Sequence, residues 1–173
     1  MNSRPAPDNL QRLDRQLCFA LYSTSLAMTK LYKPLLAPLG LTYPQYLVLL
    51  VLWETDAMTV NELGARLFLD SGTLTPLLKR MQAAGWIART RDTADERRVI
   101  VALTPTGRAL RRKAAHIPVE LAQATGCGLP ELVALTTQLQ TLRDRMVARG
   151  DGDSANAGSF DTSTPPVTTR RSR

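Results

Sequence analysis

The segment 59–85 constrains the fold most, because it contains two helix starts separated by only a few residues. Thr59 followed by Glu62 is a capping box, which predicts a short helix that ends in the late sixties. Asp70-Ser71-Gly72-Thr73 is a second cap, and it predicts a further helix that Gly85 ends. Two short helices joined by a tight turn form a helix-turn-helix pattern.

The residues that follow predict a β-hairpin. The runs 86–91 and 98–103 are rich in β-forming residues, and the polar segment 92–97 between them suits a hairpin loop. Both runs carry arginines. A helix-turn-helix followed by a basic hairpin is a winged helix, which we expect over about 44–103.

Net charge points to the same segment. The chain has a net charge of +7, and Arg66 to Lys113 holds 11 basic and 4 acidic residues, an excess of 7, while the remainder is balanced. Clustered positive charge suits a polyanion, because neutralising phosphates releases condensed counterions. Charge alone leaves open an ordinary solvated helix face.

Helices are predicted on both sides of the winged helix. Leucines at helical spacing predict a first helix over about 10–38, and Thr42 with Gln45 caps a second. Two more helices are predicted within 105–148. The fold class is therefore mainly α with a small β-hairpin wing, a winged helix-turn-helix with six helices. Residues 1–9 are expected to form an N-terminal extension, and the polar segment 150–173 a disordered tail.

Several classes of protein are not favoured. One histidine and two distant cysteines supply no metal site. No glycine-rich phosphate loop or hydrolase triad is found. We therefore predict no bound metal, no cofactor and no enzymatic activity. No apolar run reaches the roughly 18 residues of a membrane span, and we expect a cytoplasmic protein without a membrane partner. Cys18 lies among apolar residues of the first helix, where a packed thiol and a reactive thiol are both possible.

Two groups of motifs identify a resemblance that covers roughly residues 10–148. The wing sequence Asp95-Glu96-Arg97-Arg98-Val99 and the following Leu103-Thr104-Pro105-Thr106-Gly107-Arg108-Ala109-Leu110 resemble MarR-family regulators. Further stretches resemble the family's OhrR-type sensors of organic hydroperoxides; they are Leu17-Cys18-Phe19 with Tyr22, Thr29 to Leu36, Leu41 to Tyr46, and Leu69 to Arg80.

The resemblance implies a homodimer that binds a pseudo-palindromic operator in double-stranded DNA. The fourth helices would enter successive major grooves, while Arg97 reaches into the minor groove and is braced by Asp95. The helices at about 10–38 and 105–148 would form the dimerisation region. The candidate DNA-binding residues are Asp70, Ser71, Thr73, Thr75, Lys79, Arg80, Arg89, Arg91, Asp95, Arg97 and Arg98.

The resemblance also assigns Cys18 as the sensing thiol, hydrogen-bonded to Tyr32 and Tyr43. Cys18 and Tyr32 are about 21 Å apart along one helix, so they cannot touch within a subunit. If first helices pair antiparallel about a two-fold axis near Ser25, Cys18 of one subunit meets Tyr32 of the other. Hydrogen bonds from two phenols would favour the thiolate.

Cys127 lies in a glycine-flanked loop, and the resemblance to two-cysteine members makes it the resolving thiol of an intersubunit disulfide. The implied function is a repressor that releases DNA when organic hydroperoxide, its inducer, oxidises Cys18. A regulator controlled by a noncovalent aromatic ligand is an alternative, and a thiol peroxidase is a further one that the basic winged helix disfavours. The operator sequence, target genes, preferred hydroperoxide and any small-thiol partner cannot be read from the sequence.

Overall fold

The computed structural model describes the backbone of residues 11–156 and the side chains of residues 11–149. The expected extension at 1–9 and the part of the expected tail at 157–173 lie outside the described residues. The chain divides into two compact units, one up to Thr125 and one from Gly126 onward, and each is described by itself.

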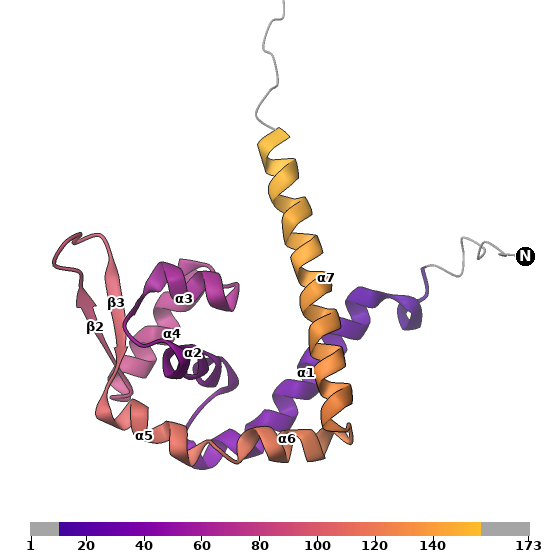
Figure 1. The fold of residues 1–173 in the computed structure, drawn as a ribbon, viewed down its shortest axis with the longest axis horizontal. Coiled ribbons are helices and arrows are strands. Elements are labelled where there is room, and N and C mark those ends of the chain that lie inside the picture. The colour runs from indigo at the N-terminus through magenta and orange to yellow at the C-terminus, as the bar shows by residue number, and fades with distance from the viewer. Residues whose placement is uncertain (1–10, 157–173) are drawn as a thin grey trace, which may run out of the picture. The chain divides into compact units, whose positions relative to one another are not determined.

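Within the described residues the first unit holds six α-helices, two short 3-10 helices and three strands (Figure 1). In chain order they are η2 (Leu13–Arg15), α1 (Leu17–Leu36), η3 (Ala37–Leu39), α2 (Tyr43–Glu54), β1 (Met58–Thr59), α3 (Val60–Leu67), α4 (Ser71–Ala83), β2 (Ile87–Arg91), β3 (Val99–Leu103), α5 (Pro105–Lys113) and α6 (Ile117–Thr125). The second unit holds α7 (Leu129–Asn156).

The sequence predicted six helices, and the described residues contain seven α-helices. Two helices were predicted within 105–148, and the structure has three, because the first of them is divided: α5 ends at Lys113 and α6 begins at Ile117. Pro118 is the cause: it lacks an amide hydrogen, and its ring would clash with the carbonyl group four residues earlier in a continuous helix. The mainly helical winged fold itself is confirmed.

The first helix also begins later than predicted. Residues 13–15 form a 3-10 turn, Gln16 is extended, and α1 starts at Leu17. Leu13 is 61% exposed within the described residues, so little packing there favours an earlier helix start. Cys18 is consequently the second residue of α1 and not a mid-helix residue.

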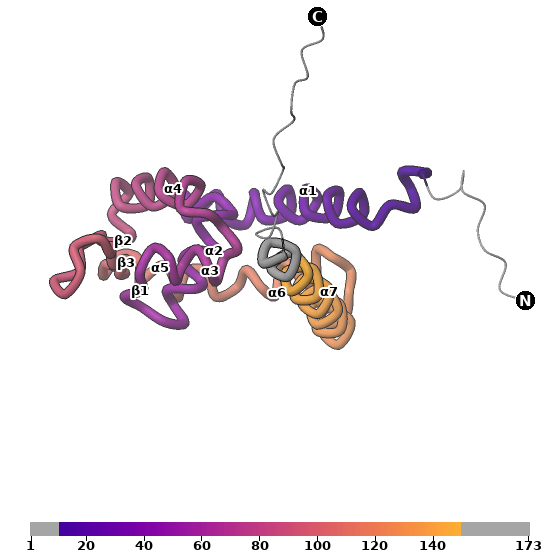
Figure 2. The backbone as a smooth tube through the Cα atoms, turned by 90° about the horizontal axis from the view of Figure 1, so that it is seen from above, coloured from indigo at the N-terminus to yellow at the C-terminus, as the bar shows by residue number. Residues whose placement is uncertain are grey.

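A small sheet and a helical core position the wing. The strand order is β1-β3-β2, with both pairs antiparallel; the two-residue strand β1 was not predicted. β2 and β3 extend beyond the helices as a hairpin (Figure 1). Helix α2 is buried on most sides, with Val48, Leu49 and Leu52 at the centre of the core. Helix α4 lies along one side of this unit, and α2, α3 and α5 lie to the other side of it (Figure 2).

In the second unit, α7 carries apolar side chains that this chain leaves exposed, among them Val133, Leu139 and Met146. The helix continues past residue 150, where the disordered tail was expected to begin, as far as Asn156. Among the described residues no single helix is long and apolar enough to cross a membrane; only the bent pair Leu17–Leu39 and Tyr43–Glu54, with 72° between its halves, satisfies that length and composition together.

Candidate nucleic-acid interface and thiol site

Helix α4 has one buried face and one exposed polar face. Leu74, Leu77, Leu78 and Met81 pack into the core. Most of the predicted contact residues point the other way: the side chains of Ser71, Thr73, Lys79 and Arg80 are exposed, and Thr75 is half-buried. The 3.6-residue period of the leucines creates this division, because it turns the intervening polar positions toward solvent.

The first turn of α4 is already capped. Oδ1 of Asp70 accepts a hydrogen bond of 2.8 Å from the amide of Thr73, and Oδ2 accepts one of 2.8 Å from the Thr73 hydroxyl. These two bonds lower the pKa of Asp70. The hydroxyl of Thr75 donates to the carbonyl oxygen of Ser71 at 2.7 Å. Thr73 was predicted to contact DNA; in the structure its amide and hydroxyl both donate to Asp70, so the hydroxyl can meet DNA only as an acceptor.

Arg97 is the most exposed of the wing side chains with an assigned ion pair. Its amide and its Nε both donate to Oδ1 of Asp95 at 3.1 Å, which is the bracing contact that the sequence led us to expect. The side chain remains 92% exposed. The guanidinium hydrogen bond from Arg97 also lowers the pKa of Asp95. The ion pair therefore fixes the base of a side chain whose far end faces solvent.

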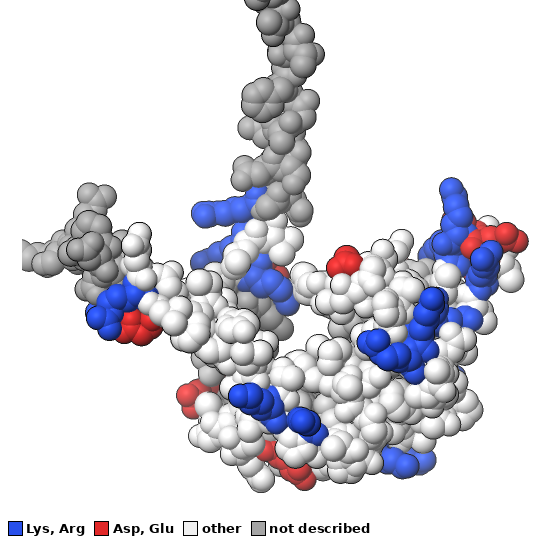
Figure 3. All heavy atoms as spheres, turned by 180° about the vertical axis from the view of Figure 1, so that it is seen from behind, with Lys and Arg blue, Asp and Glu red and all other residues white. Residues whose placement is uncertain are grey.

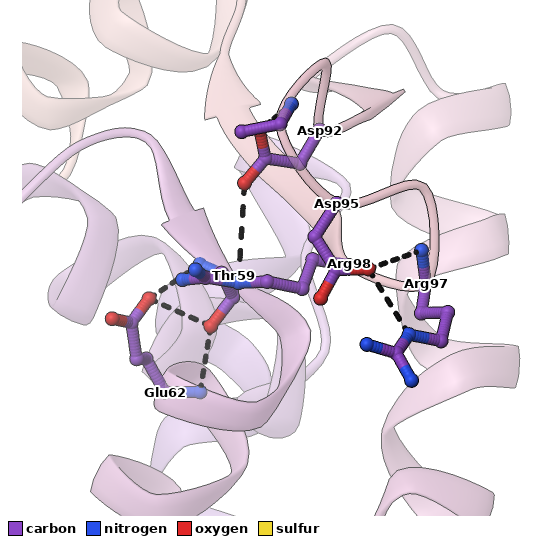
Figure 4. A network of polar contacts seen from close by, with 7 residues as sticks. Thr59, Glu62, Asp92, Asp95, Arg97 and Arg98 are labelled. Atoms are coloured by element: carbon purple, nitrogen blue, oxygen red, sulfur yellow. Dashed lines mark hydrogen bonds and ion pairs between the residues drawn. The ribbon is translucent and has the colours of Figure 1, made fainter.

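Arg98 has different surroundings, although it is the next residue. Its Nε lies 3.9 Å from Oδ2 of Asp92, and its side chain extends toward Thr59 and Glu62 at the start of α3 (Figure 4). Hydrogen bonds from Thr59 lower the pKa of Glu62, and the positive charge of Arg98 lowers it further. Arg98 thus connects the wing to α3, a role that the sequence did not indicate.

The two arginines of β2 also differ. Arg91 is exposed, whereas Arg89 is half-buried, and its Nε is a buried polar atom without a hydrogen-bond partner in the described part of the chain. Figure 3 shows Lys and Arg side chains on the wing side of the first unit, with acidic side chains next to them. Arg91, Arg97 and Arg98 of the wing are therefore exposed to solvent, whereas Arg89 is only partly so.

The residues predicted for the thiol site lie on two helices, α1 and α2, and only the two tyrosines are in contact. Cys18 is exposed in the first turn of α1, while Tyr32 lies about four turns further along the same helix. The ring of Tyr32 stacks on Tyr43 from the start of α2, with 4.5 Å between centroids. Burial, with smaller contributions from Tyr43 and Tyr46, raises the pKa of Tyr32 to about 12. Burial raises the pKa of Tyr43 as well. Both phenols therefore keep their protons near neutral pH and are hydrogen-bond donors.

The structure adds two aromatic residues that the sequence analysis missed. Tyr46 is 2% exposed and lies 5.8 Å from Tyr32 between ring centroids. Trp53 meets Tyr46 edge-on at 6.1 Å, and its indole Nε1 donates to the carbonyl oxygen of Gly107 at 3.0 Å. The aromatic positions 43, 46 and 53 share one face of α2, a spacing that is visible in the sequence.

Cys127 is half-buried and belongs to the second unit, between Gly126 and Gly128. Gly126 has a φ of 69°, which favours glycine. The described residues contain no group of three or more histidine, cysteine or carboxylate side chains that could hold a metal ion.

Comparisons with known proteins place the chain in a family. A family model described as transcriptional regulator SarA/Rot matches residues 30–113. The organic hydroperoxide resistance transcriptional regulator of Bacillus subtilis is 51% identical over 138 residues, which cover 78% of this chain and 94% of that protein. The chain belongs to the MarR family of transcriptional regulators. It is an OhrR-type member, a regulator and not an enzyme, as the sequence motifs predicted.

Two further comparisons extend over most of this OhrR-type chain. The regulator TtmR of Methylorubrum extorquens is 51% identical over 147 residues, covering 85% of this chain and 75% of TtmR. The solved structure of reduced AbfR bound to DNA is 33% identical with a TM-score of 0.68, and covers 82% of this chain and 99% of that one. AbfR is from Staphylococcus epidermidis. These similarities extend beyond the winged helix, into the helices on both sides of it.

Proposed function

We propose that this OhrR-type regulator is a homodimeric repressor that senses organic hydroperoxides through Cys18 and releases its operator when Cys18 forms an intersubunit disulfide with Cys127. The observation that carries the proposal is the stacked pair Tyr32 and Tyr43. These two protonated phenols lie near the C-terminal end of α1, and Cys18 lies at its N-terminal end. The Bacillus subtilis relative, named for organic hydroperoxide resistance, supports the same inducer.

A second subunit completes the thiol site. Cys18 and Tyr32 are separated by about 21 Å of α1, so the phenols must act on a thiol from another chain. The surface of α1 between them carries exposed apolar side chains: Phe19, Tyr22 and Leu26 are 37%, 61% and 46% exposed. Exposed apolar surface along a helix suits a self-complementary pairing about a two-fold axis. An antiparallel pair of α1 helices places each Cys18 opposite the partner's tyrosine pair.

The chemistry needs only the two thiols and the peroxide. The Cys18 thiolate attacks one peroxide oxygen; an S–O bond forms, the O–O bond breaks, and the alkoxide leaves and takes a proton to become an alcohol. Sulfur is thereby oxidised to sulfenic acid. The Cys127 thiol of the other subunit then attacks the Cys18 sulfur, an S–S bond forms, and water leaves. Two donated phenol hydrogen bonds stabilise the thiolate from which the sequence starts.

The disulfide, in this proposal, is the step that releases DNA. Solved structures of AbfR are described as reduced and bound to DNA, as overoxidized and bound to DNA, and as disulfide formed. Oxidation of one sulfur need not therefore release an operator. A disulfide requires Cα atoms within about 7 Å, and closing to that distance changes the separation of the two recognition helices.

The proposed DNA contacts are assigned to side chains of α4 and of the wing that are exposed to solvent. The exposed face of α4 reads a major groove, with Lys79 and Arg80 as its cationic side chains, and Arg97 enters the adjacent minor groove with Asp95 fixing its base. Arg91 contacts phosphates. A two-fold dimer then reads a pseudo-palindromic operator whose half-sites lie about 34 Å apart.

The decisive experiment compares wild type with Cys18→Ser on DNA flanking the protein's own gene, before and after an organic hydroperoxide. Wild type should bind when reduced and release when oxidised, and Cys18→Ser should bind under both conditions. Hydroperoxide release of the Cys18→Ser variant would refute the redox mechanism. If, in addition, an aromatic ligand released both proteins, control by a noncovalent ligand would replace it.

A second variant separates the resolving thiol from a small thiol. Cys127→Ser treated with hydroperoxide alone should be oxidised at Cys18 and stay on DNA. If a small thiol added with the hydroperoxide then releases this variant from DNA, a mixed disulfide between Cys18 and the small thiol can replace the disulfide with Cys127. Release of Cys127→Ser by hydroperoxide alone, without any thiol, would contradict the disulfide step while leaving the sensing role of Cys18 intact.

A further inference from the structure

Helix α2 contacts the tyrosine pair at one end and the base of the wing at the other. Tyr43 and Tyr46 lie in its first turn, and Trp53 lies in its last. Ten residues separate Tyr43 from Trp53, which is about 15 Å of helix. The helix is buried along most of its length, so it can move only as a packed body.

The aromatic rings form a continuous series of contacts from the first turn of α2 to its last. The Tyr32 and Tyr43 centroids are 4.5 Å apart, those of Tyr32 and Tyr46 are 5.8 Å apart, and those of Tyr46 and Trp53 are 6.1 Å apart. Aromatic pairs at these separations are in van der Waals contact and prefer particular ring orientations. A displacement of Tyr32 therefore has to be accommodated by Tyr46 and, next, by Trp53.

At the last turn of α2, Trp53 is hydrogen-bonded to Gly107, a residue that packs tightly against the start of the hairpin. Its indole donates at 3.0 Å to the carbonyl oxygen of Gly107 on α5. A Cβ atom on Gly107 would lie 2.0 Å from the carbonyl oxygen of Trp86, so α5 is pressed against the residue directly before β2. The position of Trp53 is thus tied to the start of the hairpin.

Asp56, just after α2, holds the end of the hairpin. Its Oδ1 accepts a hydrogen bond of 2.8 Å from the amide of Leu103, the last residue of β3. Its Oδ2 pairs with the guanidinium of Arg108 on α5. Trp53 and Asp56 together thus make three polar contacts with the segment 103–108, where β3 passes into α5.

From these contacts we infer that α2 couples the tyrosine pair to the wing, and that Trp53 and Asp56 are the positioning residues at the wing end. The inference rests on the proposed function for the event at the other end, where loss of the Cys18 thiolate changes what Tyr32 contacts. The change reaches the wing because the segment 103–108 is bonded to Trp53 and Asp56 and moves with the end of α2. Trp53 touches neither the thiol nor the wing tip.

The test uses Trp53→Phe, which keeps an aromatic ring against Tyr46 and removes the hydrogen-bond donor to Gly107. Operator Kd is measured for reduced and for hydroperoxide-oxidised protein, with Cys18 oxidation followed by mass spectrometry. Cys18 should oxidise at the wild-type rate, while the ratio of oxidised to reduced Kd falls about fivefold, a change within the range of one neutral hydrogen bond. Asp56→Asn should lower that ratio too, because it removes the charge that pairs with Arg108.

Glu54→Gln is the matched control. Glu54 is the last residue of α2 and pairs with Arg66 of α3, so this substitution also removes an ion pair from the same helix end. It does not touch the segment 103–108, and the Kd ratio should keep its wild-type value. If Trp53→Phe changed the reduced and oxidised Kd by the same factor, Trp53 would be a packing residue only and the inference would fail.

A double-mutant cycle tests the coupling without oxidation. Tyr32→Ala, Trp53→Phe and the double variant are compared for operator Kd in the reduced state, with thermal unfolding to establish that each is folded. Coupling predicts that the combined effect departs from the product of the single effects by at least about threefold. Additive effects would overturn the inference even if Cys18 proves to be the sensor. Coupling in the cycle combined with hydroperoxide release of Cys18→Ser would instead refute only the proposed function.

Discussion

Tyr32 of α1 and Tyr43 of α2 stack with 4.5 Å between ring centroids and 27° between ring planes. Eleven residues separate them in the chain, and the turn through η3 brings them together. Their side chains form one end of a cluster whose pKa values are raised by burial. The stacked pair therefore forms within a single chain, and the proposed function uses its two phenols as hydrogen-bond donors.

The first prediction concerns the rate of thiol oxidation. Tyr32→Phe and Tyr43→Phe each remove one phenol donor while keeping the stacked ring. A hydrogen bond to a charged group contributes about 1.5–3 kcal/mol, so each variant should slow hydroperoxide oxidation of Cys18 by about tenfold or more. The rate is measured by trapping the sulfenic acid. Tyr46→Phe, in the same cluster, should react at close to the wild-type rate; equal slowing by all three would point to packing and not to donation.

The second prediction is an alkaline loss of stability. Burial raises the pKa of Tyr32 to about 12, and it raises the pKa of Tyr43 and Tyr46 as well. Because the folded state favours the protonated phenols, their contribution to stability is fully present below pH 10, the ordinary tyrosine value, and is lost as the pH rises from about 10 to about 12.

Ultraviolet absorbance of phenolate and urea unfolding at each pH measure this effect. Three of the four tyrosines should ionise late, and Tyr32→Phe should remove the last step. Tyr22→Phe, at a site 61% exposed, should leave that step in place. Simultaneous ionisation of all tyrosines near pH 10 would contradict the buried cluster.

The third prediction distinguishes two adjacent arginines. Arg97 is 92% exposed and held by Asp95, whereas Arg98 pairs with Asp92 and faces the start of α3. Arg97→Ala should weaken operator binding about tenfold and reduce the slope of log K against log salt by about one. Arg98→Ala should weaken binding less and lower the melting temperature more. Binding is followed by fluorescence anisotropy over a salt series, and the reverse order of effects would reject the assigned roles.

The fourth prediction concerns the base of the wing. Gly107→Ala places a methyl group 2.0 Å from the carbonyl oxygen of Trp86, so α5 must shift, at a cost of about 3 kcal/mol or more in unfolding free energy. Gly85→Ala is the comparison: its φ of 74° strains an alanine, but no atom lies within 4 Å of the added carbon. That substitution should cost about 1 kcal/mol. Similar urea midpoints for the two variants would show that the contact at Gly107 is not close.

The parts of the structure that local chemistry determines were predictable from the sequence. The capping boxes at Thr42 and Thr59 and the cap at Asp70 are present where they were predicted, because a cap depends on residues within one turn. The hairpin also follows its β-rich runs. The break at Pro118 was missed, although its cause is local, because the apolar periodicity continues through it.

The contacts that join distant segments were not predictable. Asp56 and Leu103, or Trp53 and Gly107, carry no sign in the sequence of being neighbours, since each pair is fixed only once α5 packs on α2. The start of α1 was predicted too early for a related reason. Leucine spacing indicates which face a helix would bury, but Leu13 is 61% exposed among the described residues. The tyrosine pair was expected from resemblance alone, and its stacking is a result of the fold.

Thr59 belongs to two elements at once. It pairs with Ile100 as the last residue of β1, and its side chain caps the first turn of α3. A slip of the strand would uncap the helix, so hairpin base and α3 should open together in hydrogen exchange, as a single cooperative unit. Insertions can consequently be tolerated at the wing tip around residue 94, whereas one between residues 59 and 60 would disconnect strand from helix. The length of the wing can therefore change without disturbing the strand-to-helix junction at Thr59.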